Sequence, residues 1–271
     1  MGRTLYLNEN NGMMVVRDGP SVLVKSESEA CRRVPARLLS RAVIIGNVRL
    51  EAGVITLFTE YDIPVVFLNG RGDEVAVAIP YNHKLARHYE KQKIFLQSDD
   101  HVAKYENWAN TKRMTIQIKV IPKLRPELSH IAGHGIGEGN YQILLSKMKP
   151  VEEKWQLVSG VVNNLFRGLI VEHLLKADLD PHLGVIHRRH NFGFALDICY
   201  ILGAESDMQC IQFFKQAPKA GCILKTKDGC RLTDEGIRSI IHRFENRRIV
   251  IHNKVNSVID ELFELMRELR I

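Results

Sequence analysis

The stretch Asp178-Leu-Asp-Pro-His-Leu-Gly-Val-Ile-His187, followed closely by Phe194-Ala-Leu-Asp197, is the most informative part of this chain. A proline and a glycine interrupt regular structure in the first segment, which therefore predicts a turn, and the second predicts a helix. An imidazole and a carboxylate ten residues apart, with Arg188 and Arg189 between them, suit a divalent cation beside an anionic ligand. A turn before an amphipathic helix is common, so the rest of the chain has to identify the chemistry.

Composition narrows the classes of protein. A net charge of +7 and a pI near 9.2 favour an acidic partner, nucleic acid above all. The five cysteines form no CxxC pair and no zinc-type spacing, and we recognise no signal peptide, which together predict a reducing cytoplasm. The longest apolar runs are too short to span a bilayer, so we expect that this chain is not a membrane protein.

Two kinds of periodicity divide the chain. Alternation predicts strands before Pro80, and apolar spacing of three and four predicts helices after it. We therefore expect an α+β protein with a β-rich domain over residues 1–80 and a helical domain over 81–271. The expected strands are 4–7, 13–16, 21–25, 42–46, 64–68 and 74–79, with a helix at 50–61; the later helices are 85–96, 99–114, 153–175, one capped by Thr233, and 255–269.

Short motifs carry a family resemblance that covers almost the whole chain. In this order and spacing the chain resembles the CRISPR-associated adaptation integrase, the subunit that inserts new spacers. The motifs are Arg3-Thr-Leu-Tyr-Leu7, Ile44-Ile-Gly-Asn-Val48, Ile63-Pro-Val-Val-Phe-Leu68, Leu179-Asp-Pro181 through His187, Ala195-Leu-Asp197 and Gly229-Cys-Arg-Leu-Thr-Asp-Glu-Gly236.

The resemblance implies both a fold and an activity. The fold would be an N-terminal β-sandwich that mediates dimerisation, followed by an all-α catalytic domain. The activity would be that of a metal-dependent DNA endonuclease and integrase in antiviral defence, in which a DNA 3′-hydroxyl attacks a phosphodiester at the edge of the repeat array. The implied partners are protospacer DNA and the repeat array, a second copy of the chain, and the small second subunit of the adaptation complex.

The resemblance also assigns the metal ligands. They are a glutamate early in the helical domain, here Glu138, then His187, and an acid on the next helix. The family carries two acids on that helix, one at the place of Asp197 and one three residues later, and the second is usually credited with the metal. Here the second position is Tyr200, and a neutral phenol is a poor ligand for a hard cation.

Two interpretations of this departure stay open. In the first, Asp197 completes a site with Glu138 and His187 that holds Mg²⁺ or Mn²⁺. In the second, the protein is a catalytically weakened or silent DNA-binding scaffold of the same family. A transposon integrase of the same fold is a third, weaker hypothesis. The predicted DNA contacts are Lys84, Arg87, Arg188, Arg189, Lys215 and Lys219.

Overall fold

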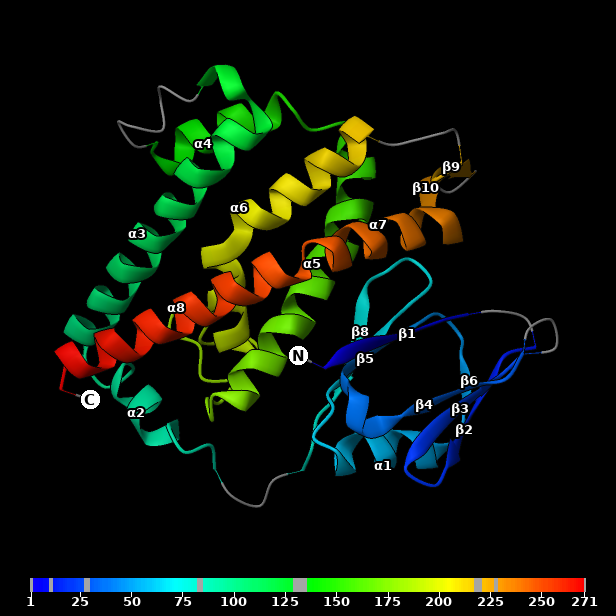
Figure 1. Ribbon diagram of the computed structural model, residues 1–271. Helices are drawn as coiled ribbons and strands as arrows, with labels where there is room; N and C mark the ends of the chain where they lie inside the picture. Colours follow the sequence, from blue (N-terminus) through cyan, green and yellow to red (C-terminus); the bar gives the residue numbers. More distant parts are fainter. Residues whose placement is uncertain are drawn as a thin grey trace. The chain divides into compact units, whose positions relative to one another are not determined.

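A computed structural model describes residues 2–9, 12–26, 30–81, 85–128, 136–216, 221–226 and 229–270. The chain divides into two compact units, Met1–Lys84 and Leu85–Ile271 (Figure 1). Sheets make up the first unit and helices dominate the second, which confirms the predicted α+β organisation.

The first unit contains two four-stranded sheets. In one sheet the order is β1-β5-β7-β8, with β1, β5 and β7 parallel and β8 antiparallel; in the other it is β4-β3-β2-β6. Its elements are β1 (Arg3–Asn8), β2 (Met14–Asp18), β3 (Ser21–Lys25), β4 (Arg32–Pro35), η1 (Ala36–Leu38), β5 (Leu39–Ile45), β6 (Arg49–Leu50), α1 (Ala52–Glu60), β7 (Val65–Leu68) and β8 (Glu74–Ala78).

Both sheets and α1 share one apolar core. Leu5 and Ile44 come from the first sheet, Val15 and Val22 from the second, and Phe58 from α1. Strand β5 is buried along its whole length, and its second half, Ala42 to Ile45, is the continuous apolar run expected of a central parallel strand; the buried Ser40 and Arg41 precede that run. Strand β4 was not expected, because its Arg-Arg-Val-Pro sequence does not alternate; it pairs with β3 along the sheet edge.

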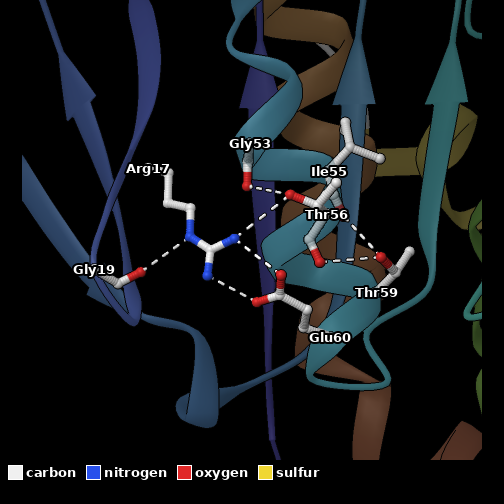
Figure 2. Close-up of polar contacts among 7 residues, drawn as sticks. All are labelled: Arg17, Gly19, Gly53, Ile55, Thr56, Thr59 and Glu60. Carbon is white, nitrogen blue, oxygen red and sulfur yellow. Dashed lines mark hydrogen bonds and ion pairs between the residues drawn. The ribbon is translucent and has the colours of Figure 1, made fainter.

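An arginine joins β2 to α1 at the surface of the first unit (Figure 2). The Arg17 guanidinium donates to both carboxylate oxygens of Glu60, at 3.0 and 2.7 Å, and to the Gly19 carbonyl at 3.4 Å. Its ion pair lowers the pKa of Glu60. The contact orients α1 against the hairpin formed by β2 and β3.

The second unit is a helical bundle in which α6 packs against α3 and α5 (Figure 1). Thr233 caps α7 as predicted, since its hydroxyl accepts a hydrogen bond from the Gly236 N–H at 3.1 Å. The elements are α2 (Tyr89–Ile94), α3 (Asp99–Leu124), η2 (Pro126–Leu128), α4 (Glu138–Ser146), α5 (Glu152–Lys176), α6 (Gly193–Gln216), β9 (Ile223–Thr226), β10 (Gly229–Leu232), α7 (Asp234–Asn246) and α8 (Arg248–Glu268).

Helix α4 was not among the expected helices, and two further features of this unit differ from the prediction. The unit is not all-α, because β9 and β10 form an antiparallel hairpin between α6 and α7. Helix α3 runs ten residues past Met114 and through Pro122, because its buried Val120, Ile121 and Leu124 continue the apolar face. Within the described residues, every helix is too short or too polar to cross a membrane.

Candidate functional site

Backbone contacts close the turn that carries His187. Asp178 and Phe192 take positive φ angles of 55° and 57° near its two ends. A Cβ atom on Gly184 would lie 2.5 Å from the Gly193 carbonyl carbon, and one on Gly193 would lie 2.4 Å from the His187 carbonyl oxygen. Only glycine permits this close approach of two chain segments. The turn therefore delivers His187 directly to the first turns of α6.

Asp197, on α6, holds the turn through its carboxylate. One oxygen accepts the Val185 and Ile186 N–H groups at 2.7 and 3.2 Å. The other accepts the His187 backbone N–H at 2.9 Å and the His187 ring Nδ1 at 2.7 Å. The Asp197 side chain is 0 % exposed, so the protein surrounds this carboxylate with donors.

This geometry makes Asp197 a positioning residue for His187. Because a carboxylate can only accept a hydrogen bond at Nδ1, the neutral form of the ring bound in this way has its lone pair on Nε2. The His187 side chain is 30 % exposed and can present that nitrogen to a ligand. The predicted metal-ligand role for Asp197 does not match this arrangement, because its oxygens are already bound to four N–H groups.

Glu138 is the first residue of α4 and meets three donors. Arg113 on α3 donates to both carboxylate oxygens, through Nε at 2.9 Å and Nη2 at 2.8 Å. Gln117 donates to one oxygen at 2.6 Å, and Gln142 donates to the other at 2.7 Å. The Arg113 guanidinium is the main cause that lowers the pKa of Glu138 to about 2, with the two glutamines adding to it. Glu138 is therefore a carboxylate paired with a buried arginine.

Tyr200 stacks on the guanidinium of the same arginine. Its ring centroid is 4.5 Å from the Arg113 Cζ, and its hydroxyl donates to the Asn110 side-chain oxygen at 2.7 Å. The ring centroids of Tyr200 and His187 are 6.5 Å apart. The structure thus brings Glu138, His187 and Tyr200 into one neighbourhood, in which Arg113 contacts both Glu138 and Tyr200.

The candidate ligand groups in this neighbourhood are not arranged to bind a divalent metal ion. Glu138 is occupied by Arg113 and two amides, Asp197 is enclosed, and Tyr200 brings a neutral phenol. Across the parts of the chain that the structure describes, no group of three or more His, Cys, Asp or Glu side chains is arranged to hold a metal ion. His187 is the one predicted ligand whose geometry leaves a donor atom for an incoming group.

Comparisons with known proteins bear on the family. The family model for CRISPR associated protein Cas1 matches residues 5–125. A CAS1 protein from Thermotoga maritima has the same fold, with a TM-score of 0.79 and 14% identity over 98% of this chain and 97% of that one. The resemblance to the Cas1 family is confirmed.

Two further solved structures share the fold of this chain. A casposase bound to an integration product gives a TM-score of 0.75 with 16% identity, covering 99% of this chain and 91% of the casposase. A chain of a Cas6-RT-Cas1--Cas2 complex gives 0.75 with 14% identity, covering 99% of this chain and 35% of the longer one. No curated protein matches by sequence. At these identities the structural matches show a shared fold.

The six predicted DNA contacts differ in their surroundings. Arg87, Arg188 and Arg189 are exposed, and the Arg188 Nε donates to the Val185 carbonyl at 2.9 Å. Lys215 is exposed too, but its ammonium donates to the Leu124 carbonyl at 2.7 Å and so joins α6 to the end of α3. Lys84 and Lys219 lie outside the described residues.

The sequence prediction missed the side chains that surround Glu138. Arg113 and Gln117 are four residues apart on α3 and therefore share a face. Asp207, seven residues after Tyr200 on α6, accepts the Tyr141 hydroxyl at 2.9 Å, and burial raises its pKa to about 6. An arginine and a glutamine at helical spacing on an otherwise apolar face were the available signal, and only the fold shows that this face meets Glu138.

Proposed function

We propose that this protein binds DNA as a subunit of a CRISPR adaptation complex, and that it acts there as a scaffold with no metal-dependent strand transfer of its own. The proposed partners are duplex DNA with free 3′ ends, a second copy of the chain, and a small second subunit. The surroundings of Glu138 carry the proposal, because they supply an arginine where the family resemblance expects a metal.

The charge distribution supports DNA binding by the helical unit. The first unit contains 10 Lys and Arg against 9 Asp and Glu, so most of the net charge of +7 belongs to the second. Arg188 and Arg189 lie side by side on the exposed turn next to His187. Cations on such a turn suit phosphate contacts, which provide most of the affinity of nonspecific DNA binding.

DNA binding in the presence of a chelator tests this proposal. Fluorescence anisotropy with a short duplex bearing 3′ overhangs, measured in EDTA over a series of salt concentrations, should show binding that weakens steeply with salt. The double variant Arg188→Ala/Arg189→Ala should bind more weakly and lower the log–log salt slope by about 2. The matched control Arg231→Ala/Arg238→Ala removes two other exposed arginines and should keep the native slope. Equal losses in both variants would contradict the assignment of this turn.

A metal-dependent integrase is the second candidate, and the intact pair of His187 and Asp197 favours it. This candidate requires Mg²⁺ or Mn²⁺ and requires Glu138 to leave Arg113. The test incubates the protein with a supercoiled plasmid carrying a repeat array and a duplex with free 3′-hydroxyls, in either metal or in chelator. We expect no joined product. Metal-dependent joining that is lost in Glu138→Gln and in His187→Ala, but retained in Tyr200→Phe, would establish the integrase and refute the scaffold.

A further inference from the structure

We infer that the Arg113 guanidinium is a permanent cation of the protein that occupies the place of a metal ion between Glu138 and α6. The inference rests on the site described above and deepens the proposed function. It predicts that the native protein needs no divalent ion to assemble this region, and that Arg113 and Tyr200 together exclude one.

The first argument is that three helices fix the position of the guanidinium: Arg113 belongs to α3, and its side chain binds groups of α4 and α6. Nε and Nη2 bind the Glu138 carboxylate of α4, and Nη1 donates to the Tyr200 backbone carbonyl of α6. The flat face of the group lies over the Tyr200 ring, with Cζ 4.5 Å from the centroid. A planar guanidinium can pair with a carboxylate and stack on an aromatic ring simultaneously, which a lysine cannot reproduce.

The second argument comes from Gly203, one turn after Tyr200 on α6. A Cβ atom at this position would lie 2.6 Å from the Arg113 Nη1. Any larger side chain would therefore push the guanidinium away from the Tyr200 carbonyl. The backbone of α6 is shaped to accept Arg113, so its placement is a feature of the fold and not one conformation of a surface side chain, as its 8 % exposure also indicates.

The third argument is charge balance. Arg113 and Glu138 neutralise one another, and Tyr200 adds no charge where the family resemblance gives a second acid. A divalent ion here would place two further positive charges beside a nearly buried arginine, and Glu138 is the one carboxylate that binds the guanidinium directly. The nearby Asp207 carboxylate accepts the Tyr141 hydroxyl, and burial raises its pKa to about 6, so it adds little negative charge to offset the ion. Since unpaired charge in a buried site is strongly unfavourable, the arginine and the metal ion exclude one another.

A metal-binding titration tests the inference without any measurement of activity. The EPR signal of free Mn²⁺ is followed during titration with the native protein and with Arg113→Met, Tyr200→Asp and the double variant. Lys119→Met is the control, since it removes a cation from an exposed position of the same helix. Thermal unfolding of each protein is recorded with Mn²⁺ and with EDTA, and DNA binding in EDTA is recorded separately.

We expect no saturable Mn²⁺ binding and no Mn²⁺-dependent shift in Tm for the native protein or for Lys119→Met. We expect the double variant to bind one Mn²⁺ per chain and to gain Tm with the ion, because a ligand that binds the folded state stabilises it. Stoichiometric Mn²⁺ binding by the native protein that is lost in Glu138→Gln and in His187→Ala would overturn the inference. A folded double variant that binds no Mn²⁺ would also overturn it.

Two comparisons keep the test decisive if the double variant fails to fold. The native titration still shows whether an ion binds beside Arg113. In EDTA, Arg113→Met must also lower the Tm more than Lys119→Met does; equal values would mean that the guanidinium does not hold the site together. DNA binding that fails in EDTA while these results hold would reject the scaffold function and leave the arginine assignment intact.

Discussion

Replacing Asp197 by alanine should lower the free energy of unfolding of the helical unit by about 3–5 kcal/mol, estimated from the donors that it leaves behind. The buried carboxylate accepts three backbone N–H groups and the His187 ring, and alanine satisfies none of them. A buried donor without an acceptor costs about 1–3 kcal/mol. The two short backbone bonds, from Val185 and His187, account for most of the expected loss.

The neighbouring ring provides the internal comparison. His187→Ala removes one hydrogen bond at a side chain that is 30 % exposed, so we expect a loss of about 1 kcal/mol. Asp260→Ala, at an exposed position of α8, should change stability by less than about 0.5 kcal/mol. The ranking of the three variants follows from a positioning role for Asp197. A carboxylate whose only role was to bind a metal ion would not destabilise the metal-free protein when removed.

Urea unfolding followed by circular dichroism at 222 nm measures these differences, since most helices belong to the second unit. With an m value of about 2.5 kcal/mol/M, a loss of 4 kcal/mol moves the midpoint by about 1.6 M urea. A shift for Asp197→Ala no larger than that of His187→Ala would refute the reasoning, and the carboxylate would then be free to act as a ligand.

Three further predictions concern local features of the fold. The pKa of Glu138 lies near 2, so its contribution to stability is present above about pH 4.5 and is lost as pH falls toward 2; acid unfolding of Glu138→Gln, compared with native, should lack that contribution. Gly193→Ala should destabilise the helical unit and change the chemical shift of His187, because the new methyl group would collide with the His187 carbonyl, and unchanged NMR spectra and midpoint would contradict this. Thr233→Ala should cost about 1 kcal/mol through the lost cap on Gly236, which urea unfolding can measure against Thr233→Ser as a control that keeps the hydroxyl.

Local patterns predicted most elements of this protein. Alternating residues predicted strands β1 and β3, and the hydroxyl before two acids predicted the start of α7 at Thr233. The sequence pattern did not predict strand β4, because pairing with β3 at the sheet edge needs no alternation of apolar residues. The local pattern also predicted too early an end for α3. The last turns of this helix are stabilised by contact with α6, whose residues are far away in the sequence.

The candidate site was harder to predict for the same reason. The motif around His187 indicated that the ring and Asp197 lie together, and they do, at 2.7 Å. Sequence spacing does not distinguish a carboxylate that faces an ion from one that faces backbone N–H groups, because the two differ only in burial. The partner of Glu138 is 25 residues away on another helix, and no local pattern connects Arg113 to it.

The contact between Gly184 and Gly193 also has a consequence for how this protein can change. It brings the two ends of the segment 185–192 together. The carboxylate of Asp197 also holds this segment, because it accepts hydrogen bonds from three of the segment's backbone N–H groups. The exposed residues Arg188, Arg189 and His190 can therefore be exchanged without disturbing α6. The exposed tip of the turn can therefore vary while its base stays fixed. Substitutions there can alter the affinity for a polyanion while the fold keeps its stability.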